Sequence, residues 1–133
     1  MSEGITVYAV SDMTGTTVGR IVRAASAQFP AGHVSIKVLS HAISAEQIVG
    51  FIQRQGDDRG PCAVFHTILA KRTREDLRNA LQTLRIPSID LLGSTAHVMA
   101  DLLGDDPQET PGLTIDDGVE PVVFDLASES VPS

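Results

Sequence analysis

Four short apolar runs alternate along this chain with four segments whose apolar residues recur at helical spacing. The expected strand and helix pairs are 5–10 with 18–29, 34–39 with 45–55, 62–68 with 73–84, and 88–92 with 93–103. Strands that alternate with helices form a parallel sheet covered by those helices, and right-handed crossovers leave few topologies. The sequence therefore predicts an α/β fold, a doubly wound (flavodoxin-like) parallel sheet of about four strands in the order 2-1-3-4.

The composition changes near residue 104, which divides the chain into an α/β domain (1–104) and a tail (105–133). Residues 1–100 hold all ten Lys and Arg against eight acids, whereas residues 101–133 hold nine acids and no Lys or Arg. The tail contains the turn signals Pro111-Gly112 and Asp116-Asp117-Gly118. We expect an irregular, acidic, partly disordered tail in which residues 122–124 form one short strand at a sheet edge.

Charge and composition exclude several classes of protein. A weakly positive body with an acidic tail argues against binding to nucleic acid, which depends on neutralising phosphates. No apolar segment approaches the ~20 residues that span a bilayer, so no membrane association is expected. The lone Cys62 fits the reducing cytoplasm, where we expect the protein to act. The four histidines show no metal-ligand spacing, and we therefore expect no metal site.

The turn after the first strand is the first candidate binding site. A strand that runs into a helix start directs free backbone N–H groups, and the positive end of the helix dipole, at one place. The candidate phosphate or anion ligands in this turn are Ser11, Asp12, Thr14, Gly15, Thr16 and Thr17. A second interpretation stays open, in which Asp12 or Thr14 only caps the helix.

Four basic residues, Lys71, Arg72, Arg74 and Arg78, cluster where the third strand passes into its helix. The predicted strand order brings this loop beside the first one, so that Arg72 and Arg74 can clamp a phosphate there. Alternatively, these residues form a solvated helix start and pair with nearby acids. Thr73 with Asp76 is expected to cap this helix. His66, inside the third strand, is expected to be a core imidazole with its hydrogen bonds satisfied.

The known phosphate loops are absent from this sequence. The Walker signature needs a lysine after a glycine, and neither Lys37 nor Lys71 has one. Gly15 and Gly19 are too widely spaced for a dinucleotide fingerprint. Ser11 does not lie in a nucleophile elbow of the G-x-S-x-G type. We therefore predict no catalytic residues and no cofactor in this chain.

Two segments resemble the amino-terminal half of the bacterial and plant pyruvate, phosphate dikinase and phosphoenolpyruvate synthase regulatory proteins. Residues 10–18 and 25–29 are similar to the family pattern V-S-D-S-T-G-E-T-A followed by A-x-A-Q-F. Residues 86–93 are similar to its I-P-x-x-D-L-L-G segment, and the match runs from about Ile5 to Gly104. The chain departs from the family pattern at Met13, Thr16, Val18 and Gly19.

The resemblance implies a regulatory protein that is a serine/threonine kinase and phosphate-dependent pyrophosphorylase. The family uses ADP and phosphate through a G-x-S-R-x-x-K-T loop in its second half, which has no counterpart in these 133 residues. We therefore expect a regulatory domain for self-association as a homodimer, for recognition of the dikinase or synthase, or for phosphate or nucleotide sensing. Two alternatives stay open: part of an active kinase/pyrophosphorylase, and a freestanding small-molecule sensor.

Overall fold

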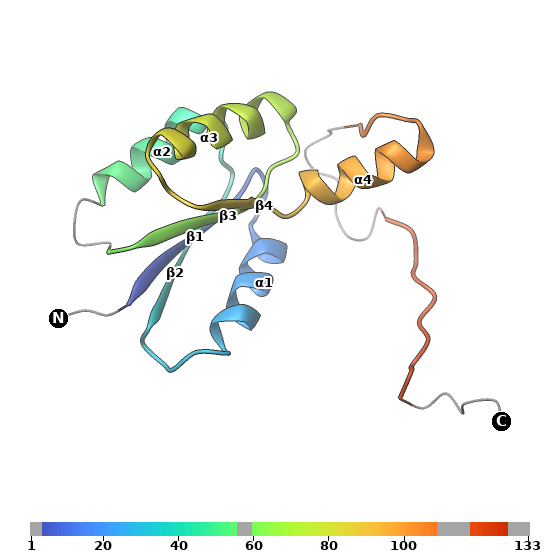
Figure 1. The fold of residues 1–133 in the computed structure, drawn as a ribbon, viewed down its shortest axis with the longest axis horizontal. Helices are drawn as coiled ribbons and strands as arrows, with labels where there is room; N and C mark the ends of the chain where they lie inside the picture. The colour runs from blue at the N-terminus through green and yellow to red at the C-terminus, as the bar shows by residue number, and fades with distance from the viewer. Residues whose placement is uncertain (1–3, 56–59, 109–117, 128–133) are drawn as a thin grey trace.

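We analysed a computed structural model of the chain, which describes residues 4–55, 60–108 and 118–127 (Figure 1). Four strands alternate with four helices, as the sequence predicts. In chain order they are β1 (Ile5–Ser11), α1 (Thr16–Ser26), β2 (Val34–Leu39), α2 (Ala45–Arg54), β3 (Cys62–Thr67), α3 (Lys71–Thr83), β4 (Ser88–Asp90) and α4 (Gly93–Leu103).

The four strands form one parallel sheet in the order β2-β1-β3-β4, which confirms the predicted order. The order reverses between β1 and β3, so the loops that follow these two strands lie at the same edge of the sheet. The register places His66 of β3 between Val10 of β1 and Asp90 of β4. The register therefore places the polar residues His66 and Asp90 side by side on neighbouring strands.

Helices α2 and α3 cover one face of the sheet, and α1 covers the other (Figure 1). Alternate residues of β1 serve the two faces, because successive strand side chains point in opposite directions. Fully buried residues on the α2/α3 face are Tyr8, Val10, Ile48, Ile52, Val64, Ile68, Leu77 and Leu81. The α1 face has a smaller buried cluster of Val7, Ala9, Val18 and Val22.

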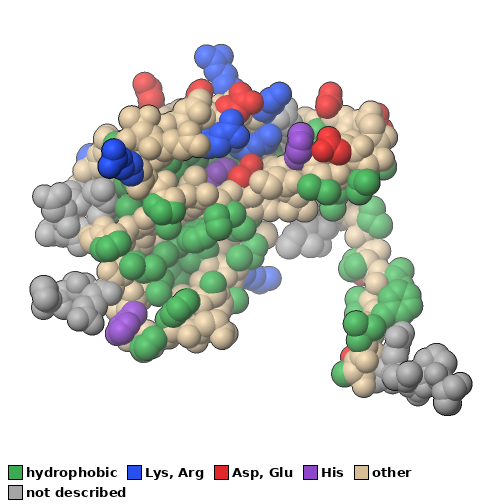
Figure 2. All heavy atoms as spheres, viewed as in Figure 1, with side chains coloured by type: hydrophobic (Ala, Val, Ile, Leu, Met, Phe, Trp, Pro, Cys, Tyr) green, Lys and Arg blue, Asp and Glu red, His purple; other side chains and the backbone are tan. Residues whose placement is uncertain are grey.

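Helix α4 extends beyond the edge of the sheet and makes no extended contact with any other described element (Figure 1). Its side chains Val98, Met99, Leu102 and Leu103 are all more than half exposed. Figure 2 shows hydrophobic side chains along this helix and in the tail. The helix is therefore formed but largely unburied.

Local signals explain most of the helix boundaries. The spacing of Ser44 and Gln47 in the sequence predicts a capping box at the start of α2. It is confirmed, because the Ser44 hydroxyl accepts a hydrogen bond from Gln47 N (3.1 Å) and Gln47 Oε1 accepts one from Ile43 N (2.8 Å). The predicted cap of α3 is wrong. This helix begins two residues before Thr73, and its N-cap residue is Ala70, which provides no side-chain cap.

The described parts of the tail, residues 105–108 and 118–127, are irregular and exposed. The short strand expected at residues 122–124 is wrong: they belong to no strand, and the sheet ends at the three-residue β4. An edge strand this short offers few backbone groups for pairing. The turn signals at 111–112 and 116–117 lie outside the described residues. In the described parts of the chain, no helix combines the length and apolarity needed to cross a membrane.

Candidate functional site

The loop between β1 and α1 is tightly held at its base. Ser11 is buried, and its hydroxyl accepts a hydrogen bond from Met13 N at 2.9 Å. Gly15 has φ +86°, and a Cβ added there would lie 2.7 Å from Cγ1 of Val38. Only glycine fits this position without strain, because L side chains disfavour the left-handed region and Val38 occupies the space. The loop geometry therefore depends on Gly15.

Asp12 connects this loop to the loop after β3. Its Oδ2 accepts a hydrogen bond from Leu69 N at 3.0 Å. The interpretation that Asp12 caps α1 is therefore wrong, and the N-cap residue of that helix is Gly15, with no side-chain cap. Thr14 Oγ1 forms a 3.0 Å hydrogen bond with Thr16 Oγ1 and accepts a longer one, of 3.4 Å, from Thr16 N. That Ser11, Asp12, Thr14, Gly15, Thr16 and Thr17 bind an anion stays a prediction.

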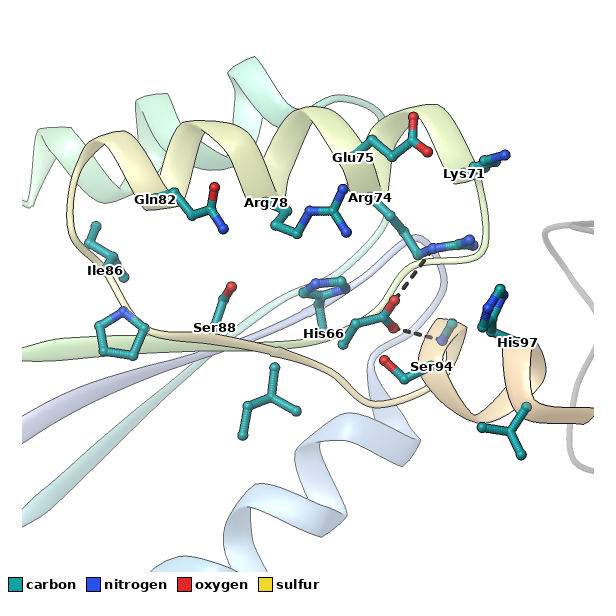
Figure 3. A pocket seen from close by; sticks show the side chains of 15 residues that line it. His66, Lys71, Arg74, Glu75, Arg78, Gln82, Ile86, Ser88, Ser94 and His97 are labelled. Atoms are coloured by element: carbon teal, nitrogen blue, oxygen red, sulfur yellow. Dashed lines mark hydrogen bonds and ion pairs between the residues drawn. The ribbon is translucent and has the colours of Figure 1, made fainter.

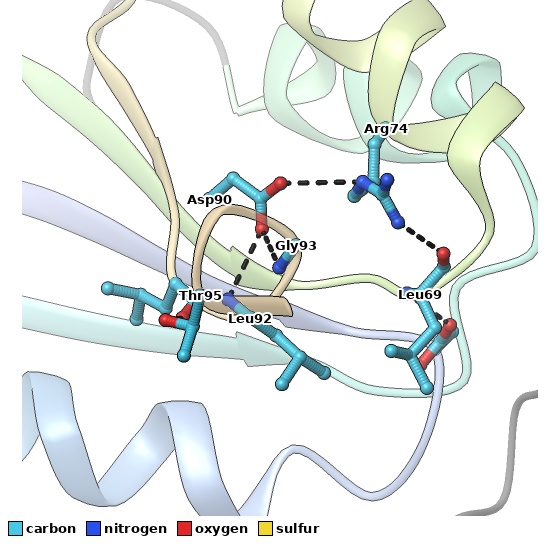
Figure 4. Close-up of polar contacts among 8 residues, drawn as sticks. Leu69, Arg74, Asp90, Leu92, Gly93 and Thr95 are labelled. Atoms are coloured by element: carbon cyan, nitrogen blue, oxygen red, sulfur yellow. Dashed lines mark hydrogen bonds and ion pairs between the residues drawn. The ribbon is translucent and has the colours of Figure 1, made fainter. Parts of the chain in front are cut away.

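The two arginines predicted to help this loop lie in different environments. The Arg72 side chain is 95% exposed and lies 3.9 Å from Asp76, one helical turn away. The Arg74 side chain is only 20% exposed; its Nε lies 3.4 Å from Asp90 Oδ2, and its Nη1 donates to the Leu69 carbonyl (Figure 4). The structure therefore brings Arg74, but not Arg72, to the polar edge of the sheet.

Asp90 organises the turn from β4 into α4. Its Oδ1 accepts hydrogen bonds from Leu92 N (3.2 Å) and Gly93 N (2.6 Å), while its Oδ2 faces Arg74 (Figure 4). These bonds explain why β4 ends at Asp90 rather than at the predicted residue 92. A Cβ added to Gly93 would lie 2.2 Å from Asp90 Oδ2 and 2.6 Å from Arg74 Nε. The ion pair therefore requires glycine at the start of α4.

A cleft of about 910 Å³ lies between α3, β4 and the start of α4 (Figure 3). Helix α3 lines it with the basic residues Lys71, Arg74 and Arg78. Figure 2 shows Lys and Arg side chains gathered over this helix. In the described part of the chain, neither Lys71 nor Arg78 forms an ion pair. We call this space the α3–β4 cleft; its uncompensated cations favour an anionic occupant.

His66 lies at the floor of the α3–β4 cleft, below Arg78 in Figure 3. The residue is only 3% exposed, which confirms the predicted burial, and its Nδ1 has no hydrogen-bond partner among the described residues. The prediction that its hydrogen bonds are satisfied is therefore wrong. Burial lowers the pKa of His66 below 6.5, nearby Arg74 lowers it further, and Asp90 partly opposes them. The imidazole is consequently neutral at pH 7.

Sequence reasoning did not single out His66, Arg78 and Asp90 as one group. The strand order provided a signal, because it places β4 beside β3 and therefore pairs the region of Asp90 with that of His66. The spacing of Lys71, Arg74 and Arg78 at i, i+3 and i+7 also places them on one side of a helix. Within the described ranges, no cluster of three or more His, Cys, Asp or Glu residues could hold a metal ion.

Comparison with known proteins identifies relatives of this chain. A family described as kinase/pyrophosphorylase matches residues 7–120. A protein of Geotalea daltonii named as a pyruvate, phosphate dikinase regulatory protein is 34% identical over 107 residues, which cover 80% of this chain and 39% of that relative. A protein of Listeria monocytogenes, named as regulatory protein 1 for the same dikinase, is 31% identical over 106 residues, covering 80% and 38%. The chain thus spans less than half the length of these relatives.

Proposed function

The chain belongs to the kinase/pyrophosphorylase family, and on that premise we propose that it acts as a regulatory domain that recognises a protein partner through α4. The observation that carries the proposal is the exposure of Val98, Met99, Leu102 and Leu103, which we call the α4 apolar face. An amphipathic helix normally buries its apolar stripe, and an unburied stripe marks a protein-binding surface.

The proposed partner is pyruvate, phosphate dikinase, the enzyme in the names of the relatives. Phosphoenolpyruvate synthase, its counterpart in the family resemblance, is tested in parallel, and the proposed compartment is the cytoplasm. The α4 apolar face has acidic neighbours, because Asp101, Asp105 and Asp106 are exposed at the same end of the helix. A partner surface that fits is therefore an apolar groove with Lys or Arg at its rim.

The proposal assigns no phosphoryl transfer and no ADP site to these residues alone. Phosphoryl transfer needs a cradle for the phosphates and charge neutralisation around the transferred group. The sequence contains no Walker loop and no G-x-S-R-x-x-K-T segment to supply the cradle. The chain covers 39% of a relative's length, which supports a second candidate: these residues form part of an active kinase/pyrophosphorylase.

The test is binding of the 133-residue chain to purified dikinase, and separately to purified synthase, measured by calorimetry. We expect the double change Leu102→Glu and Leu103→Glu to weaken binding more than tenfold, because it places two charges in the buried centre of the interface. Ile43→Glu is the matched control, since Ile43 is also exposed but lies before α2. No binding to either enzyme, or equal loss with Ile43→Glu, would contradict the proposal. Self-association abolished by the same double change, without enzyme binding, would show that a second copy is the partner.

A further inference from the structure

We propose that the α3–β4 cleft binds a small phosphate-bearing anion, either inorganic phosphate or a phosphate monoester, through Arg78, Lys71 and His66. This site differs from the loop at residues 11–17, and it shares only Val98 with the α4 apolar face. Two observations carry it independently: the charges on α3 and the unpartnered buried nitrogen of His66.

The charge balance of the cleft favours an anion. Arg74 is neutralised by Asp90, with 3.4 Å between Nε and Oδ2. Lys71 and Arg78 have no ion-pair partner in the described part of the chain, and both line the cleft. Glu75 is the opposing charge in the lining, and it is exposed. Two cations against one free carboxylate leave the cleft positive, and a guanidinium matches the geometry of phosphate oxygens.

The floor of the cleft provides the second observation. His66 is 3% exposed, and its Nδ1 is buried without a partner among the described residues. Leaving a buried polar atom unpaired is costly, and native proteins keep such atoms rarely and for a reason. A neutral imidazole with its proton on Nδ1 donates one hydrogen bond, which a phosphate oxygen accepts. The anion thus satisfies an atom that the protein leaves unpaired.

The remaining lining narrows the class of ligand. The Ser88 hydroxyl and the Gln82 amide also line the cleft and can donate to a tetrahedral oxyanion from other directions. Among the described residues that line the cleft, none is a Phe, Tyr or Trp on which a nucleobase could stack. A compact phosphate or monoester therefore fits this site better than a nucleotide does.

The test is titration of the 133-residue chain with inorganic phosphate and, separately, with ethyl phosphate, followed by calorimetry. Arg78→Gln is expected to weaken binding more than tenfold. Arg72→Gln is the matched control, because it removes the same charge from the same helix at a 95% exposed position outside the cleft, and it should change affinity less than twofold. Glu75→Gln should tighten binding. Preference between the two probes distinguishes free phosphate from an ester, and either one supports the site.

Nitrogen NMR of the His66 imidazole provides a readout that a general charge effect does not move. Phosphate should shift the Nδ1 resonance in the wild-type chain and in Arg72→Gln, and the shift should be lost in Arg78→Gln at the same concentration. Circular dichroism checks that each variant is folded. Absence of binding to both probes would overturn the proposal, as would equal weakening by Arg72→Gln and Arg78→Gln. Weakening by Thr16→Val but not by Arg78→Gln would place the anion at the loop instead.

Discussion

The two faces of the sheet differ in how completely the helices bury their side chains. On the α2/α3 face, two helices enclose large side chains such as Tyr8, Ile52 and Leu81, none of which has measurable exposure. On the α1 face, one helix covers Val7 and Ala9, while Ile89 and Val38 are about half exposed. The first face therefore buries more apolar surface and contributes more to the stability of the domain, whereas the second leaves apolar side chains exposed.

The largest difference should appear between a leucine of the α2/α3 face, Leu81, and a leucine of α4, Leu102, which lies on neither face of the sheet. Leu81→Ala should lower the free energy of unfolding by about 3 kcal/mol, because it leaves a cavity in a closed core. Leu102 is 84% exposed, so Leu102→Ala should cost less than about 0.5 kcal/mol. Urea unfolding of both variants measures the difference. Similar losses would mean that α4 is packed in solution.

On the α1 face, we expect the free energy of unfolding to depend on the backbone conformation of Gly15 in the loop before α1. Gly15→Ala is expected to cost about 2 kcal/mol, because the left-handed conformation alone costs roughly 1–2 kcal/mol and the new methyl group meets Val38. Gly32→Ala is the matched control, since its φ is +85° but nothing lies within 4 Å. The control should lose only the conformational part, as measured by thermal and urea unfolding. Equal losses would show that the contact with Val38 is unimportant.

The buried His66 should make the free energy of unfolding depend on pH. The pKa of His66 is lowered below 6.5 by burial and by Arg74, with Asp90 opposing, so below pH 6.5 the unfolded chain binds the proton more readily. Stability should therefore fall as the pH drops from about 6.5 through the folded pKa, at no more than about 1.4 kcal/mol per pH unit. The other charged side chains that line this cleft are Lys71, Arg78 and Glu75.

The variant His66→Gln should remove this dependence of the free energy of unfolding on pH. The measurement is the urea midpoint at several pH values between 5 and 7.5. His97→Gln is the control, because the His97 side chain is 74% exposed and faces Asp101 at 3.6 Å. A slope that persists in His66→Gln would assign the pH dependence to another group.

The topology was predictable because its determinants are local. The alternation of strand and helix patterns, with right-handed crossovers, was sufficient to give the order β2-β1-β3-β4. The cap of α2 was predictable because Ser44 and Gln47 lie three residues apart. The start of α3 was not, because Ala70 carries no capping group and no local signal marks it.

The site was less predictable because its contacts join residues far apart in the sequence. Arg74 was correctly placed at the end of the sheet, but its partner Asp90 belongs to another strand. Asp12 is positioned by Leu69 N, which no pattern around residues 11–17 reveals. The unpaired state of His66 depends on what its neighbours fail to supply. Residues 122–124 show the opposite error, since their high β propensity did not make them a strand of the sheet.

The attachment of α4 at one end makes this helix a lever. Asp90 holds its first turn through Leu92 N and Gly93 N, and the rest of the helix has no extended contact with another described element. Eleven residues at about 1.5 Å each give an arm roughly 15 Å long. A rotation of about 20° at its first turn would therefore carry Leu103 through about 5 Å. The far end of the α4 apolar face would thus move much further than the turn at Asp90 that holds the helix.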